Sequence, residues 1–102
     1  MIPVSKPTIS ELELSYVSDA VKTGWVSSAG SYLKKFEQEF ASFYKVKHCV
    51  ALSNGTAALE VALHSVGVKE GDEVIIPSFT IMSLALAVIR VGAIPVVVDV
   101  DT

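Results

Sequence analysis

The chain has 102 residues, of which 51% are hydrophobic and 19% charged, and its formal net charge is -3. This composition excludes disordered, collagenous and coiled-coil proteins, and the length allows at most one compact domain. No run of basic residues exceeds Lys34-Lys35, so the basic patch that nucleic-acid binding requires is missing. We therefore expect no nucleic-acid partner. The high apolar fraction is typical of a piece of a larger core.

Membrane and secretory classes are also disfavoured. Residues 1–7 lack a basic start followed by an apolar stretch, so no secretory signal is expected. The apolar run Ile81–Val98 contains Arg90 and Pro95, which a membrane span tolerates poorly. The single Cys49 cannot form an internal disulfide and fits a reducing compartment. We expect a cytoplasmic protein without a membrane partner.

Residues 1–47 have a helical pattern. Ser10 and Glu13 form a capping box that predicts a helix start, and Gly24 is placed to end that helix. After a turn over residues 27–30, a second helix is predicted by apolar side chains at helical spacing. These are Leu33, Phe36, Phe40 and Phe43. Their spacing favours core packing over a ligand site.

From residue 48 the pattern becomes strand, turn, helix, repeated. Strands are expected over residues 49–52, 74–76 and 94–98, and helices over residues 57–66 and 81–91. The strands are apolar on both faces, which predicts a parallel sheet covered on both sides. We expect one incomplete α/β domain, the N-terminal part of a longer enzyme, with a helical segment at 1–47 and the start of the α/β part at 48–102.

The loop after the first expected strand has the chemistry of a phosphate site. Gly55 lets the backbone approach a ligand, while the Thr56 hydroxyl and the free amides of the following helix offer donors at the positive end of its dipole. Plain helix capping by Ser53, Asn54 or Thr56 explains the same residues equally well. Neither a dinucleotide fingerprint nor a P-loop is present.

Several stretches, in order along nearly the whole chain, resemble the DegT/DnrJ family of sugar aminotransferases that use pyridoxal 5'-phosphate (PLP). The matching stretches are 23–30, 36–37, 40–41, 46–48, 53–59, 71–80 and 92–99. The resemblance implies the aspartate aminotransferase fold (fold type I), with two leading helices and then a β-α-β-α-β parallel sheet in the PLP-binding large domain. Residues 25–28 with the loop 54–56 look most similar to the branch that makes GDP-perosamine and related 4-amino and 3-amino sugar nucleotides.

The resemblance also implies roles for individual residues. Gly55, Thr56 and Ala57 would hold the PLP phosphate, and Ile81 would lie over the pyridine ring, where the family usually has an aromatic residue. The alternative is that Ile81 is the first core residue of its helix. Trp25 and Ser27 would line the sugar-nucleotide pocket. The alternative is that Trp25 packs the two leading helices together while the serines cap.

The catalytic lysine and the aspartate that pairs with the pyridinium nitrogen are expected, from the resemblance, outside these residues. No catalytic residue is therefore assigned in this chain. All seven lysines fall on polar helix faces or in turns, which indicates solvated positions. His48, His64 and Cys49 match no zinc pattern, so no metal site is expected. Asp99 and Asp101 follow a strand. They could be active-site carboxylates or ordinary solvent-exposed residues at the end of the strand, and the sequence fits both equally.

The resemblance implies a cytoplasmic homodimer with its active site at the subunit interface. It would transfer an amino group from an amino acid, glutamate by expectation, to a keto-sugar nucleotide in polysaccharide or amino-sugar biosynthesis. Two other classes remain open from the residues: a doubly wound nucleotide-binding domain of an oxidoreductase, and a non-catalytic binding module. The first would need a glycine-rich fingerprint, which is absent.

Overall fold

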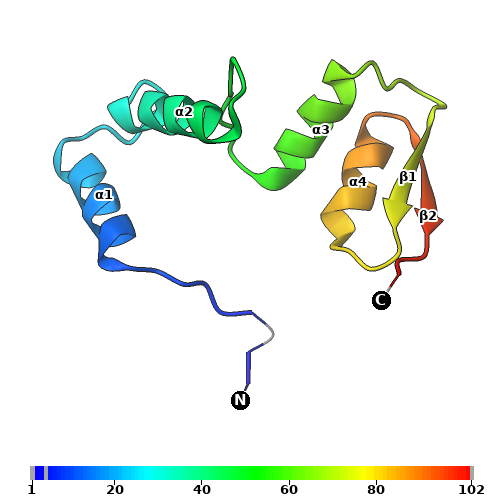
Figure 1. Ribbon diagram of the computed structural model, residues 1–102, viewed down its shortest axis with the longest axis horizontal. Coiled ribbons are helices and arrows are strands. Elements are labelled where there is room, and N and C mark those ends of the chain that lie inside the picture. The colour runs from blue at the N-terminus through cyan, green and yellow to red at the C-terminus, as the bar shows by residue number, and fades with distance from the viewer. Residues whose placement is uncertain (1, 4, 102) are drawn as a thin grey trace. The chain divides into compact units, whose positions relative to one another are not determined.

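The computed structural model describes residues 2–3 and 5–101, which form two compact units. Unit 1 comprises residues 1–51 and carries helices α1 (Glu11–Lys22) and α2 (Ser31–Tyr44). Unit 2 comprises residues 52–102 and carries α3 (Gly55–Ser65), β1 (Glu73–Pro77), α4 (Met82–Arg90) and β2 (Ile94–Val98) (Figure 1).

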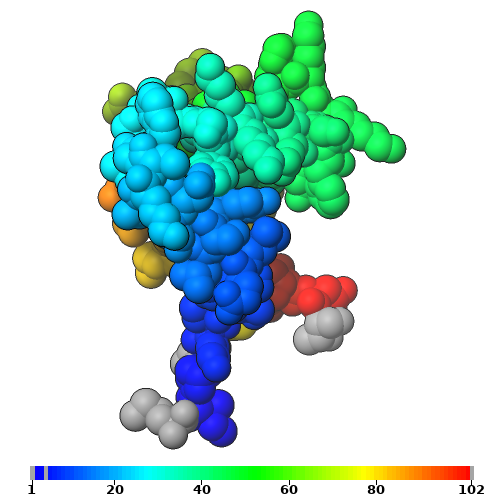
Figure 2. Space-filling view, turned by 90° about the vertical axis from the view of Figure 1, so that its left-hand side faces the viewer, coloured from blue at the N-terminus to red at the C-terminus, as the bar shows by residue number. Residues whose placement is uncertain are grey.

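Helix α1 begins and ends as its sequence predicts. The Ser10 hydroxyl accepts a hydrogen bond from the Leu12 N–H at 3.3 Å, and the Glu13 carboxylate accepts one from the Ser10 N–H at 2.7 Å. This capping box satisfies donors that have no partner inside the helix. The helix stops before Gly24, whose φ of 74° lies in the left-handed region that glycine adopts easily. In Figure 2, the side chains of α1 (blue) and of the residues leading into α2 (cyan) lie at the surface.

Helix α2 forms where predicted, but its aromatic stripe does not enter a core. Phe36, Phe40 and Phe43 are 50%, 42% and 78% exposed. The Phe36 and Phe40 ring centroids lie 5.5 Å apart, so these rings contact each other along the helix. The expectation of core packing is therefore wrong within unit 1. The reason is that this unit has only two helices, and no hydrophobic side chain among its described residues is buried.

Unit 2 contains the core. Strands β1 and β2 are parallel, with Glu73 opposite Ile94 and Pro77 opposite Val98. Helix α4 connects the strands and contacts both of them, and α3 lies beside α4 (Figure 1). The core cluster of buried side chains comes from β1, from α4 and from the turn that follows it: Ile76, Val88, Val91 and Ala93. This arrangement confirms the predicted α/β class and the order of its elements from α3 onward.

Two details of the predicted sheet are wrong. Residues 49–52 form no strand, because a strand needs a neighbour for its ladder and β1 pairs only with β2 among the described residues. The Ala51 N–H instead donates to Glu37 Oε1 at 2.9 Å. The described sheet is also covered on one face only, since α4 packs against β1 and β2 on the face of Ile76, while Ile75 on the opposite face is 71% exposed.

Candidate functional site

A pocket of about 520 Å³ lies between the first turns of α3 and α4 in unit 2. Its volume is in the range of small-molecule and cofactor sites. Helix α4 begins after β1, so the pocket lies near the carboxyl end of a parallel strand, where α/β proteins bind their ligands. The lining residues are Gly55, Thr56, Ala58, Leu59, Ile81 and Ser83. The structure thus brings three of the predicted site residues together from two separate helices.

Gly55 and Thr56, which line this pocket, have unused hydrogen-bond donors. Their N–H groups belong to the first turn of α3, where no intrahelical acceptor exists, and neither has an acceptor among the described residues. The Thr56 hydroxyl also has no partner within this part of the chain. A Cβ added at Gly55 would meet nothing within 4 Å. Open space and free donors therefore coincide at the start of α3, which suits an anion such as a phosphate.

Asn54 supplies the cap of α3. Its Oδ1 accepts a hydrogen bond from the Ala57 N–H at 2.9 Å, and its carbonyl accepts one from the Ala58 N–H at 3.1 Å. Asn54 therefore caps the helix, while the donors of Gly55 and Thr56 have no partner among the described residues and are available to a ligand. Ala57 does not line the pocket and its N–H is engaged, so its predicted contact with a phosphate would require the cap to open. That contact stays a prediction.

The electrostatics of the two helix starts favour an anion. Neither α3 nor α4 has an acidic residue in its first turn, so no carboxylate competes for the positive ends of the helix dipoles. The start of α4 also lacks a side-chain cap, because its N-cap residue is Ile81. A negatively charged group between the two helices would meet N–H groups and hydroxyls without a repelling charge on these turns.

Ile81 is one of the apolar residues that line the pocket, together with Ala58 and Leu59. It precedes α4 and is 71% exposed, and it is absent from the core cluster around Val88. The interpretation of Ile81 as the first core residue of its helix is therefore wrong. Its exposed face can contact a flat ligand ring, although an aliphatic side chain lacks the specific stacking of an aromatic one.

Two lining residues, Leu59 and Ser83, were not predicted as site residues. Leu59 follows Gly55 by four positions and so lies on the same helix face, a signal that helical spacing could have provided. Ser83 follows Ile81 by two positions at the start of α4. Nothing in the local sequence places Ser83 beside Thr56, because their proximity depends on the packing of α3 against α4.

Trp25 and Ser27 lie in unit 1, in the segment between α1 and α2. Trp25 is 55% exposed, so it is not the buried packing residue of the alternative interpretation. The backbone N–H of Trp25 donates to the Ala20 carbonyl at 3.0 Å, and the Trp25 Cβ lies 3.5 Å from the position that a Cβ would take at Gly30. The Ser27 hydroxyl accepts from the Ala29 N–H at 3.4 Å, a turn-capping contact. Their role in substrate binding stays a prediction.

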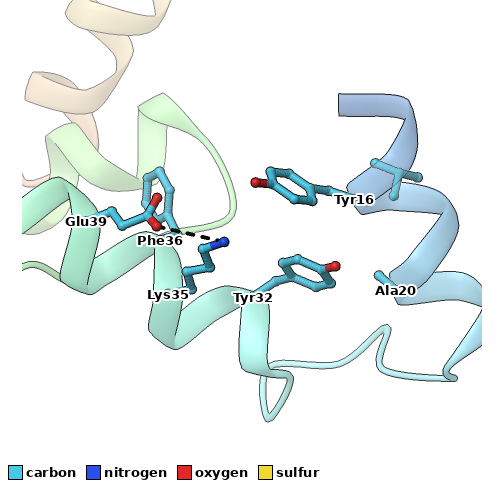
Figure 3. A pocket seen from close by; sticks show the side chains of 7 residues that line it. Tyr16, Ala20, Tyr32, Lys35, Phe36 and Glu39 are labelled. Carbon is cyan, nitrogen blue, oxygen red and sulfur yellow. Dashed lines mark ion pairs between the residues drawn. The ribbon is translucent and has the colours of Figure 1, made fainter. Parts of the chain in front are cut away.

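A second hollow, of about 340 Å³, lies between α1 and α2 (Figure 3). Three of the polar side chains that line it, Tyr32, Lys35 and Glu39, are already paired. Lys35 Nζ lies 3.9 Å from Glu39 Oε1 and 5.1 Å from the centre of the Tyr16 ring. The Tyr32 hydroxyl donates to Asp19 Oδ2 at 2.7 Å, and this hydrogen bond raises the pKa of Tyr32. Among the polar groups that line this hollow, the Tyr16 hydroxyl is left without a hydrogen-bond partner in the described part of the chain.

The remaining groups point to no second reactive centre in the described part of the chain. All seven lysines are exposed, as predicted, and none lines the pocket between α3 and α4. No group of three or more His, Cys, Asp or Glu side chains that could hold a metal is found among the described residues. No helix within these residues has the length and apolar character needed to cross a membrane.

Comparison with known proteins identifies the family. The model of the DegT/DnrJ/EryC1/StrS aminotransferase family matches residues 7–102. GDP-perosamine synthase of Vibrio cholerae is 45% identical over 101 residues, covering 99% of this chain and 28% of that protein. Spore coat polysaccharide biosynthesis protein SpsC of Bacillus subtilis is 42% identical over 100 residues, covering 98% of this chain and 25% of that protein.

A solved structure agrees with the sequence relatives. Spr1654 of Streptococcus pneumoniae, provisionally described as a sugar aminotransferase and solved in its PLP form, superposes with a TM-score of 0.82. It is 37% identical, and the match covers 98% of this chain and 25% of that one. The fold is thus the N-terminal part of a PLP-dependent aminotransferase fold, and the chain belongs to the DegT/DnrJ/EryC1/StrS aminotransferase family. It spans about a quarter of the length of these relatives.

Proposed function

We propose that this chain is part of a PLP-dependent aminotransferase that moves an amino group from an amino acid, with glutamate as the donor, to a keto-sugar nucleotide. The observation that carries the proposal is the pocket lined both by Gly55 and Thr56, whose donors are unpaired among the described residues, and by the exposed Ile81. Family membership and the PLP form of the S. pneumoniae relative support the choice of cofactor. The name of the V. cholerae relative supports a sugar nucleotide as substrate.

The residues present fit PLP on the geometry of the pocket itself. The N–H groups of Gly55 and Thr56 and the Thr56 hydroxyl would hold the phosphate, in the open space beside the Gly55 Cα. Ile81 would lie against the pyridine ring and shield it from water. Bound PLP supplies an electron sink for reactions at the α-carbon of an amino acid. The contribution of this part of the chain is to bind and orient the cofactor, and Ala57 would add its N–H only if Asn54 releases it.

The catalytic lysine is proposed to lie outside residues 1–102. A lysine suited to nucleophilic chemistry needs a partly buried place where its pKa is depressed. The seven lysines here are all exposed, and none lines the pocket. This supports the prediction that the present residues contribute cofactor binding without the amine that reacts.

Four further features stay proposals. Trp25 and Ser27 are proposed to contact the sugar nucleotide, because both are exposed and Trp25 has a free aromatic face. We also propose a homodimer with its active site at the interface, a cytoplasmic location and a role in polysaccharide biosynthesis, the last supported by the name of the B. subtilis relative. The predicted boundary between residues 47 and 48 stays a prediction.

The test is cofactor trapping in the full-length protein. We would purify it, add PLP, reduce with borohydride and map the modified peptide by mass spectrometry. One stoichiometric pyridoxyl-lysine outside residues 1–102, together with glutamate-dependent amination of a keto-sugar nucleotide, is the expected result. Labelling at any of the seven lysines described here would contradict the placement of the catalytic lysine. Absence of any PLP binding would contradict the proposed function.

A further inference from the structure

The loop that precedes Ile81, a residue of the pocket lining, has little apolar packing of its own. It comprises residues 78–80, between the end of β1 and Ile81. Phe79 is 88% exposed and Ile81 is 71% exposed, so neither side chain is held in the core. Ile81 is held on one side by α4, where the Leu84 N–H donates to the Ile81 carbonyl at 3.1 Å. On its other side, polar contacts of the loop contribute to its position.

Ser78 fastens this loop to the end of β2. Its N–H donates to the Val98 carbonyl at 2.7 Å, and its hydroxyl donates to Asp99 Oδ1 at 3.3 Å. Asp99 Oδ1 also accepts from the Val100 N–H at 2.9 Å, which fixes the carboxylate against its own backbone. Among the described residues, Phe79 and Thr80 make no hydrogen bond that anchors the loop. Ser78 and Asp99 thus form the side-chain link between the segments that follow the two strands.

Ile81 connects this link to the pocket. A small hollow of about 170 Å³ at the carboxyl end of the sheet is lined by Ser78, Ile81 and Val97 among others. Ile81 also lines the larger pocket with Thr56. One residue therefore borders both the hollow beside Ser78 and the ligand pocket, and along the chain only Phe79 and Thr80 separate it from Ser78.

We propose that Ser78 and Asp99 are positioning residues that hold Ile81 against the ring of the bound cofactor. The inference rests on the proposed function, and it assigns Asp99 a role distinct from an active-site carboxylate and from a solvated strand exit. The link acts on the ring-facing side of the pocket. The phosphate-facing donors of Gly55 and Thr56 belong to α3 and are anchored separately by the Asn54 cap.

The experiment compares Ser78→Ala, Asp99→Ala and the double variant in the full-length protein. Dissociation constants are measured for PLP and for pyridoxal, which has the ring without the phosphate. Each single variant should weaken both ligands by about three- to tenfold, the effect of losing one ordinary hydrogen bond. The double variant should be no weaker than the weaker single variant. The near-visible circular dichroism of the bound cofactor should change in parallel, because the ring loses its fixed wall.

Two matched variants separate positioning from general destabilisation. Ser65→Ala removes a serine hydroxyl that donates to the Ala62 carbonyl at 2.8 Å in α3, outside the pocket, and should leave both constants within twofold. Ser78→Thr keeps the hydroxyl and should restore binding and the dichroism. If Ser78→Ala fails to fold, Asp99→Ala carries the same test.

Three results would overturn the inference. Ser78→Ala and Asp99→Ala could behave like Ser65→Ala, their effects could be additive in the double variant, or they could weaken PLP without weakening pyridoxal. In each case the wild-type protein still binds PLP, so the proposed function stands. If the wild-type protein binds neither ligand, the proposed function fails as well, and the two failures are thereby distinguished.

Discussion

Replacing Thr56 by Val in the full-length protein tests the phosphate site directly. The substitution keeps the branched shape of the side chain and replaces the hydroxyl by a methyl group, which cannot donate a hydrogen bond. This hydroxyl has no partner among the described residues, and Thr56 is only partly buried. We therefore expect the free energy of unfolding without ligand to change by less than about 0.5 kcal/mol.

Binding should respond far more strongly than stability. A hydrogen bond from the hydroxyl to a phosphate is charge-assisted and contributes about 1.5–3 kcal/mol. At 1.4 kcal/mol per tenfold change, the dissociation constant for PLP should rise roughly 10- to 150-fold. Equilibrium dialysis against PLP measures this change. Pyridoxal, which lacks the phosphate, should bind the variant and the wild-type protein equally.

Two controls make this result decisive. Thr56→Ser keeps the hydroxyl and should bind PLP within about threefold of wild type. Thr23→Val removes a hydroxyl that donates to the Asp19 carbonyl at 2.7 Å in unit 1, and it should not alter PLP binding. A Thr56→Val protein with unchanged affinity for PLP, or an equal loss for PLP and pyridoxal, would refute the assignment of Thr56 to the phosphate.

Three further predictions follow from the same geometry. Ile81→Tyr should fold, because the site is exposed, and should tighten PLP by about 0.5–1.5 kcal/mol through stacking; equilibrium dialysis showing no gain would place the side chain away from the ring. Asn54→Ala should lower the free energy of unfolding by about 0.5–2 kcal/mol in urea titrations through loss of the α3 cap, and a neutral result would contradict the capping role. The pKa of Glu13 is lowered from its ordinary value of 4.5, mainly by the hydrogen bond from the Ser10 side chain. The ionised carboxylate therefore stabilises α1 fully at pH values above 4.5, and this stabilisation is lost as the pH falls through the lowered pKa. NMR shifts of α1 should show that acid dependence in the wild-type protein and lack it in Glu13→Gln.

Local sequence determined the elements whose hydrogen bonds close locally. Ser10 and Glu13 lie in one turn, and Gly24 ends the helix by its own backbone freedom, so the bounds of α1 could be predicted from spacing alone. The paired strands were also predictable, because their apolar runs are bounded by turns on both sides. Each of these signals involves residues a few positions apart.

The errors came from interactions between distant residues. Residues 49–52 have the composition of a strand, but a strand exists only with a neighbour, and composition does not provide one. The spacing of Phe36 and Phe40 predicts an apolar face without predicting what covers it. Likewise the loop around Thr56 was predicted, whereas Ser83 and the Ser78 to Asp99 link appear only once α3, α4 and the strands are packed together.

The contact between α3 and α4 therefore determines the geometry of the candidate site. The contacts between these helices include the ion pair from Arg90 Nη1 to Glu60 Oε1 at 2.8 Å, and Leu63 of α3 packs against the core around Val88 of α4. The Arg90 and Glu60 side chains are 60% and 29% exposed, and such a pair contributes at most about 1 kcal/mol. Val88 is 1% exposed, and burying a valine is worth roughly 1.5–3 kcal/mol, but this burial is shared among residues of β1, α4 and the following turn, and Leu63 is the cluster's contribution from α3. The ion pair and the apolar contact of Leu63 therefore both constrain the distance between the unpaired donors at the start of α3 and Ile81, which precedes α4.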